Sequence, residues 1–208
     1  MTGRKLGTGI VVLAVALLLL GTRVISQDKG TAQPPKDDEM SQMMDQGKAL
    51  NAKGAEHEKF AKAVGKWKTI TKMWKGPGTE PTVSEGTAEF RTLLDGRYLE
   101  QKYQCDMMGE SYEGIGIEGY DLTKKKYVSI WMDNTSTGIY MTTGTPDKSG
   151  KVITYIGKMD DPMSGQKDKV VKYVAREINP DHLVFEMYDT MPDGKEFKTM
   201  EIVYMRAK

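Results

Sequence analysis

The feature that most constrains the fold is a series of ten short segments, between residues 66 and 206, in which apolar and polar side chains alternate. Side chains of an extended strand point alternately to its two faces, so this period of two predicts β-strands. No long stretch of helical periodicity interrupts the series. The predicted strands span residues 66–74, 82–94, 97–107, 111–121, 126–133, 138–144, 151–158, 168–178, 182–189 and 196–206.

The segments are separated by short stretches rich in turn-forming residues, such as Asp95-Gly96 and Pro192-Asp193-Gly194. An Asp-Gly pair between two strands is a strong hairpin signal, because the tight turn needs positive φ angles. Short connections make neighbouring strands antiparallel. An open meander of this length would expose two strand edges, which closure removes. The sequence therefore predicts an all-β fold, a closed antiparallel up-and-down β-barrel of about ten strands.

Several predicted strands mix polar and apolar side chains on both faces. The segment 126–133 has an aliphatic face of Val128, Ile130 and Met132, and an opposite face of Tyr127, Ser129, Trp131 and Asp133. A solid two-sheet core would show a more uniformly apolar inner row. Mixed faces instead predict an internal and partly polar cavity, as in barrels that hold small ligands.

Residues 1–26 have the pattern of a secretory signal peptide, with Arg4 and Lys5 before the apolar run 10–20. This run has eleven residues, fewer than the roughly 20 of a membrane-spanning helix. Val24 and Ser26 suit the positions before a cleavage site. We therefore expect an exported protein, periplasmic or extracellular in a bacterium. The alternative is an uncleaved segment that anchors the chain to the membrane by its N-terminus.

The rest of the chain divides into three parts. Residues 27–36 are polar, contain a Pro-Pro pair and predict a flexible tether. Residues 37–64 predict two short helices, 37–50 and 55–64, and the second would bury Phe60, Ala61 and Val64. Residues 65–208 form the predicted barrel domain.

Charge and ligand chemistry exclude several classes of partner. The formal net charge is +1, and removal of residues 1–26 takes away three basic side chains and no acidic one. Binding to nucleic acid or, after signal cleavage, to a membrane is therefore not expected. The single cysteine, Cys105, predicts a small buried hydrophobe and excludes a disulfide framework. Two histidines, and methionines 40, 43 and 44 without a neighbouring His or Cys, give no expected metal site.

Three residues at the ends of the predicted barrel suggest how it closes. Gly65 and Trp67 begin the first strand, and Arg206 ends the last. In a closed barrel these strands are neighbours, so the guanidinium of Arg206 can lie over the indole of Trp67 and bond nearby carbonyl groups. This pattern resembles the closed end of lipocalin-like (calycin) barrels.

Two longer motifs carry a more specific resemblance. The stretch 54–67 contains Glu56-His57, a short apolar helix and Val64-Gly65-Lys66-Trp67, and the stretch 127–138 contains Trp131-Met132-Asp133 before a turn of small polar residues. Together with the Met-rich helix at 40–50, these motifs resemble a bacterial family catalogued as domain of unknown function 1579. The resemblance covers residues 38–206 and implies a lipocalin-like barrel, with no defined activity.

The strand 126–133 and the turn after it contain the best candidates for a binding site. Trp131 and Asp133 lie two residues apart, so they share a face, and with Tyr127 and Ser136 they form a candidate polar mouth. An aromatic wall beside a carboxylate can orient a small polar or cationic ligand. The alternative is that Trp131 belongs to the core and that Asp133 caps the following turn.

His57 is the remaining candidate. It begins the second predicted helix between two glutamates, where it can bond a backbone group and fix the helix across an end of the barrel. The alternative is a lid residue that contacts a ligand, or a haem ligand. In related haem-binding barrels the histidine comes from the wall, where this sequence offers only His182, beside a turn. We therefore predict no cofactor.

The predicted function is the binding of a small apolar or amphipathic molecule in the lumen. Fold alone does not determine function, so two alternatives stay open. One is an enzyme that uses Asp133, Glu113 or His57 as acid or base, and this requires two titratable groups within hydrogen-bond reach in the lumen. The other is a structural or interaction module whose lumen is filled.

Overall fold

The structure is a computed structural model that describes residues 36–107, 109–161, 165–191 and 193–208. The predicted signal peptide, residues 1–26, lies outside these residues, as does the tether except for Lys36. The chain groups into two units, Met1–Ser41 and Gln42–Lys208, and the barrel belongs entirely to the second. Within the described ranges, no helix combines the length and the apolar character needed to cross a membrane.

Ten antiparallel strands follow one another around the barrel, and β10 pairs back with β1. This arrangement confirms the predicted closed up-and-down barrel. The strands are β1 (Gly65–Met73), β2 (Thr82–Leu93), β3 (Tyr98–Met107), β4 (Glu110–Asp121), β5 (Lys126–Asp133), β6 (Tyr140–Pro146), β7 (Val152–Met159), β8 (Lys169–Asn179), β9 (His182–Thr190) and β10 (Glu196–Arg206). Every predicted strand is present, with ends within two residues of the prediction.

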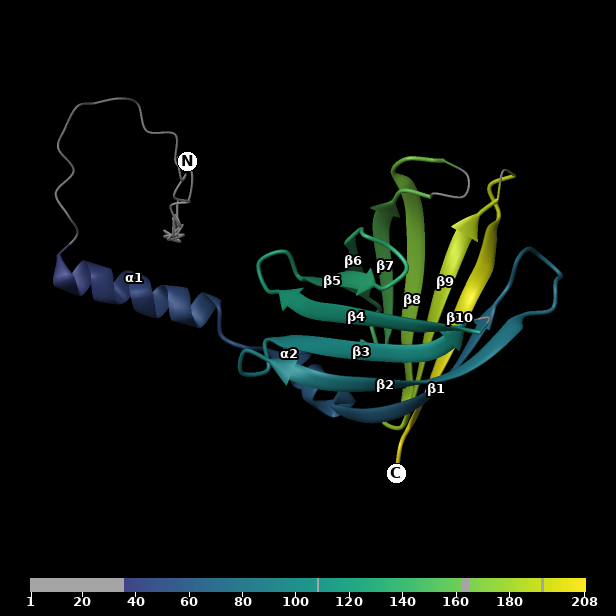
Figure 1. The fold of residues 1–208 in the computed structure, drawn as a ribbon. Helices are drawn as coiled ribbons and strands as arrows, with labels where there is room; N and C mark the ends of the chain where they lie inside the picture. The colour runs from purple at the N-terminus through teal and green to yellow at the C-terminus, as the bar shows by residue number, and fades with distance from the viewer. Residues whose placement is uncertain (1–35, 108, 162–164, 192) are drawn as a thin grey trace, which may run out of the picture. The chain divides into compact units, whose positions relative to one another are not determined.

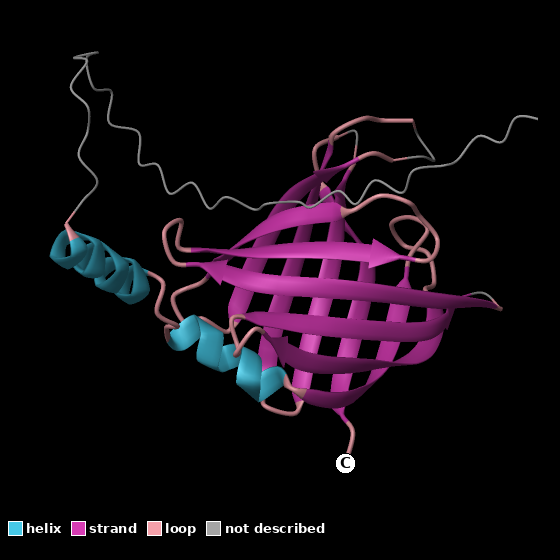
Figure 2. Ribbon diagram, turned by 60° about the vertical axis from the view of Figure 1, so that its left-hand side comes forward, coloured by secondary structure: helices cyan, strands magenta, loops and turns pink. Residues whose placement is uncertain are grey.

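The barrel is flattened into two walls that face each other. In Figures 1 and 2 the strands β2 to β5 run across the strands β7 to β10. Side chains between the walls form two buried clusters, one around Trp67, Tyr103 and Tyr204 and the other around Phe60 and Tyr127. Cys105 is buried in the first cluster, which confirms the prediction that it is a small buried hydrophobe.

Two helices precede the barrel, α1 (Asp37–Leu50) and α2 (Ala55–Ala63). None of the residues of α1 is buried. Helix α2 contacts β2, β3 and β4 and lies at one end of the barrel (Figure 2). Phe60 is buried as predicted, but Ala61 and Val64 are exposed, and His57 is the second buried residue of the helix. Val64 leaves the helical face because its backbone already turns into the extended conformation that leads to β1.

The contact between β1 and β10 brings Trp67 and Arg206 together. These residues are partners in the β-ladder, and the guanidinium carbon of Arg206 lies 4.2 Å from the centre of the Trp67 ring. The guanidinium also donates to the carbonyl oxygens of Lys62 (2.7 Å) and Val64 (2.9 Å). The last carbonyl groups of a helix have no partner within the helix. Arg206 bonds these groups and so holds the end of α2 at the contact between β1 and β10.

Candidate binding cavity

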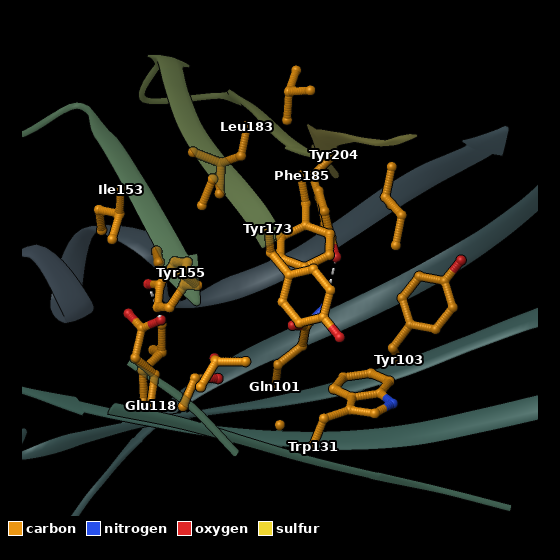
Figure 3. A pocket seen from close by; sticks show the side chains of 18 of the residues that line it. Gln101, Tyr103, Glu118, Trp131, Ile153, Tyr155, Tyr173, Leu183, Phe185 and Tyr204 are labelled. Atoms are coloured by element: carbon orange, nitrogen blue, oxygen red, sulfur yellow. Dashed lines mark hydrogen bonds between the residues drawn. The ribbon is translucent and has the colours of Figure 1, made fainter. Parts of the chain in front are cut away.

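The lumen contains a cavity of about 440 Å³ between the two walls. This volume is within the range of roughly 300–1,000 Å³ that is typical of small-molecule sites. Figure 3 shows side chains from both walls pointing into it. Its lining is mainly apolar and rich in aromatic rings, which come from Phe60, Phe90, Tyr103, Tyr112, Tyr127, Trp131, Tyr140, Tyr155, Tyr173, Phe185 and Tyr204.

The structure places three of the five predicted ligand-binding residues on the cavity wall. Tyr127, Trp131 and Asp133 all point inward from β5 and line the cavity. Ser136 and His57 do not line it. Ser136 follows the end of β5, and its hydroxyl is buried without a hydrogen-bond partner among the described residues.

His57 has a structural role at the start of α2. Its Nδ1 accepts a hydrogen bond of 3.1 Å from the backbone N–H of Gly54, the residue before the helix. Its ring packs edge-on against Phe60 and Tyr120. This arrangement satisfies one of the backbone donors at the helix start and positions α2 on the barrel, as expected for a helix-start histidine.

Asp133 is held by four hydrogen bonds from its own neighbourhood. Oδ1 accepts from the backbone N–H (3.0 Å) and the hydroxyl (2.7 Å) of Thr135, which caps the turn after β5. Oδ2 accepts from the indole N–H of Trp131 (3.2 Å) and the hydroxyl of Tyr112 (3.3 Å). Burial acts to raise the pKa of Asp133, but these hydrogen bonds outweigh it and lower the pKa below its usual value. Asp133 is therefore an ionised carboxylate whose bonding capacity is already used.

Trp131 lies flat over a strip of backbone on β4. Its ring covers Gly114 and Gly116, and a Cβ atom at Gly114 would overlap the indole. Glycine is therefore required at position 114 by the close approach of the ring. In this way β4 gives Trp131 the space in which its N–H reaches both Tyr112 and Asp133.

The second carboxylate of the lumen, Glu118, has a different environment. It points inward from β4, and its Oε2 accepts a hydrogen bond of 2.5 Å from the hydroxyl of Tyr155 on β7 (Figure 3). No other hydrogen bond and no ion pair joins Glu118 to any described residue. Burial raises the pKa of Glu118 to about 7, and the bond from Tyr155 offsets only part of this rise.

Tyr155 is positioned by a close backbone approach of the same kind. Its partner in the ladder is Gly144 on β6, where a Cβ atom would lie only 2.6 Å from Cε1 of the Tyr155 ring. Burial, together with the adjacent Glu118 carboxylate, raises the pKa of Tyr155 well above its usual value. The phenol therefore stays protonated and is the donor in its bond to Glu118.

Glu118 begins a polar row across one wall of the cavity. Its partner in the ladder is Ser129 on β5, and the partner of Ser129 is Thr142 on β6. All three line the cavity. The facing wall contributes mainly apolar side chains, including those of Ala175, Leu183, Phe185 and Ile202. The cavity therefore offers one polar and one apolar side, which is the chemistry of a site for an amphipathic molecule.

The three residues named for an enzyme do not meet. Asp133 faces the lumen, whereas Glu113 is exposed on the outer face of β4, where its Oε1 accepts from the amide of Gln104. His57 is committed to the start of α2. The structure instead brings together Glu118 and Tyr155, and the sequence prediction missed Glu118. In the ranges that the structure describes, no three His, Cys, Asp or Glu side chains form a group that could hold a metal ion.

The family model described as "Protein of unknown function (DUF1579)" matches residues 52–206. The chain belongs to this family. The resemblance seen in the motifs around Glu56-His57 and Trp131-Met132-Asp133 is thereby confirmed. The matched region of this DUF1579 member includes the whole of α2 and all ten strands, so it contains every residue that lines the cavity.

Solved structures with a similar fold support the lipocalin-like architecture of this DUF1579 member. Rv2717c from M. tuberculosis superposes with a TM-score of 0.54 at 13% identity, and the match covers 74% of this chain and 99% of that one. An S-type phycobiliprotein lyase, CPES from Guillardia theta, gives a TM-score of 0.52 at 10% identity and covers 77% of this chain and 97% of that one. No curated protein matches the chain.

Proposed function

We propose that this barrel binds a small apolar or amphipathic molecule in its lumen. The observation that carries the proposal is the cavity of about 440 Å³, lined by aromatic rings and crossed on one wall by a polar row. A barrel that served only as a structural module would fill this volume with side chains, because protein interiors are close-packed. Tyr127, Trp131 and Asp133, with Glu118 and Tyr155, are the residues we expect at the ligand.

The test uses N-phenyl-1-naphthylamine, a neutral apolar fluorophore, added to the purified chain. We expect its emission to rise with a stoichiometry of one per barrel, because the ring system leaves water for an apolar pocket. The intrinsic tryptophan fluorescence should change in the same titration, since Trp131 lines the cavity. Absence of both signals would contradict the proposal.

Matched variants locate the site. Ser129→Phe adds a ring to the lumen, whereas Thr143→Phe adds the same ring to the exposed outer face of β6. We expect the first change to abolish binding and the second to leave it unchanged. Ala175→Phe, on the facing wall, repeats the test in case the Ser129 variant does not fold. Equal binding by the inner and outer variants would place the fluorophore outside the lumen.

We also propose that the protein is exported, on the evidence of the charged start and eleven-residue apolar run within residues 1–26. The mass of the protein isolated from its native cells tests this proposal. Cleavage after Ser26 would leave Gln27 as the first residue, whereas a chain that retains the apolar run in a membrane fraction would indicate the N-terminal anchor.

A further inference from the structure

We infer that the molecule bound in the lumen is an amphipathic amine, whose protonated nitrogen bonds Glu118 while its apolar body lies against the facing wall. This inference rests on the proposed function and gives it a chemical class. Its basis is a carboxylate inside an apolar cavity that has no cationic partner among the residues that the structure describes.

The first line of evidence is the bonding of Glu118. Only the Tyr155 hydroxyl donates to it, through Oε2, and Oε1 receives no hydrogen bond from any residue that the structure describes. A buried carboxylate is costly unless charge or hydrogen bonds compensate it. An ammonium group has three donors and one positive charge, so it supplies both kinds of compensation.

The second line of evidence is the set of charged groups around Glu118. One cation of the cavity lining comes from α2, where Lys59 forms an ion pair of 2.6 Å with Glu56. Glu56 also accepts a hydrogen bond from Tyr127, which faces Glu118 from β5. Lys59 is therefore already neutralised on its own helix.

The other charged residues of the lining form no ion pair with Glu118 either. Arg176 forms an ion pair of 3.0 Å with Glu186, and Lys151 and Glu177 lie in and beside the loops at the α2 end. Asp133 lies at the opposite end of β5, with four hydrogen bonds of its own. The titratable groups that face Glu118 from β7 and β8 are the phenols of Tyr155 and Tyr173, both with raised pKa values and hence neutral.

The third line of evidence is the aromatic surroundings. Tyr155 and Tyr173 point into the cavity beside Glu118, and Phe185 packs against Tyr173 with ring centroids 5.5 Å apart (Figure 3). The faces of aromatic rings attract cations, most strongly where water is excluded. An amine seated at Glu118 would thus meet a carboxylate on one side and aromatic rings on the others, and its apolar body would contact Ile202 and Leu183.

The experiment compares three ligands with the same ring system and different charges. They are the cation of 2-(1-naphthyl)ethylamine, the neutral 2-(1-naphthyl)ethanol, and the acetate, which is the carboxylate anion of naphthalene-1-acetic acid. Calorimetry at pH 8 should show that the amine binds at least about tenfold more tightly than the alcohol. The acetate should bind most weakly. At pH 5.5 Glu118 is mainly protonated, since its pKa is about 7, so the affinity for the amine should fall by about tenfold while that for the alcohol stays constant.

Two matched variants assign the preference to Glu118. Glu118→Gln should reduce the ratio of the affinities for the amine and the alcohol to within about twofold. Glu113→Gln removes an exposed carboxylate from the outer face of the same strand and should keep the preference of the wild type. Loss of the preference in the Glu113 variant, or its retention in the Glu118 variant, would overturn the assignment.

The outcomes separate this inference from the proposed function. Equal binding of the three ligands by the wild-type barrel would overturn the amine class and leave lumen binding intact. A preference for the acetate would overturn it in favour of an anion held by Lys59. Binding of none of the three, together with no binding of the neutral fluorophore, would overturn both.

Discussion

Two carboxylates face the same lumen, and their surroundings give them opposite properties. Asp133, at the end of β5 away from α2, accepts four hydrogen bonds and has a lowered pKa. Glu118, near the α2 end of β4, accepts one and has a pKa raised to about 7. The number of donors supplied by the chain decides which effect wins, because burial acts to raise both pKa values.

This difference distinguishes two regions of the lumen by how fully the chain satisfies their carboxylates. The region around Asp133 is satisfied internally, and there the carboxylate fixes a turn and the orientation of Trp131. The region around Glu118 has bonding capacity left over and adjoins open volume. A ligand gains more from a group that the protein has not already satisfied, so the second region is where we expect recognition.

The largest expected effect is on how stability depends on pH. The pKa of Glu118 is higher in the folded chain than its unfolded value of 4.5, so its contribution is fully present below pH 4.5 and is lost as the pH rises through 7. Relative to the wild type, Glu118→Gln should therefore gain about 3 kcal/mol of unfolding free energy between pH 5 and pH 9. Urea unfolding across this range measures the gain.

Asp133→Asn is the control, and it should show the opposite sign. Because the folded pKa of Asp133 is lowered, its contribution is present above its usual pKa and is lost as the pH falls. The variant should be less stable than the wild type at pH 7, and the difference should shrink on acidification. The same sign for both variants would refute the contrast between the two carboxylates.

The next largest effect concerns the backbone strip beneath Trp131. Gly114→Ala places a methyl group where the indole lies and should cost about 2 kcal/mol, as overpacking of a core commonly does. Displacement of the ring should also break its bonds to Tyr112 and Asp133, visible as a change in near-ultraviolet circular dichroism. Gly76→Ala is the control, because a Cβ atom at Gly76 would have no neighbouring atom within 4 Å. This variant should change the unfolding free energy by less than about 0.5 kcal/mol.

The smallest effect is expected on the outer face of the same strand. The Glu113 side chain is exposed and, among the described residues, hydrogen-bonds only Gln104, so Glu113→Gln should change the unfolding free energy by less than about 0.5 kcal/mol. Binding of the neutral fluorophore should be unaffected. A large loss of binding would restore Glu113 as a functional candidate and would require a site outside the lumen.

The fold could be predicted in detail because its signals are local. Alternation of side chains and turn residues such as Asp95-Gly96 predicted ten strands, and all ten are present. Closure followed from the cost of open edges, with Trp67 and Arg206 as the residues that would meet. The structure pairs these two residues in the β-ladder between β1 and β10.

The candidate site could be predicted only in part. The strand that contains Tyr127, Trp131 and Asp133 was identified, because an aromatic and polar face is unusual beside an aliphatic one. Glu118 was missed because β4 reverses the usual pattern. Alternation of apolar residues would put Ile115 inside, whereas it is 39% exposed on the outer face, and Gly114 and Gly116 face the lumen beneath Trp131.

The sequence by itself determined the ten strands, their antiparallel order and the closure of the barrel, because periodicity, turns and edge costs act over short distances along the chain. Only the tertiary structure decided which of two lumen carboxylates keeps an oxygen to which no described residue donates a hydrogen bond. That outcome depends on donors from separate strands, Tyr155 for Glu118 and Tyr112 for Asp133, which lie 37 and 21 residues away along the chain. Spacing in the sequence contains no measure of such distances in space.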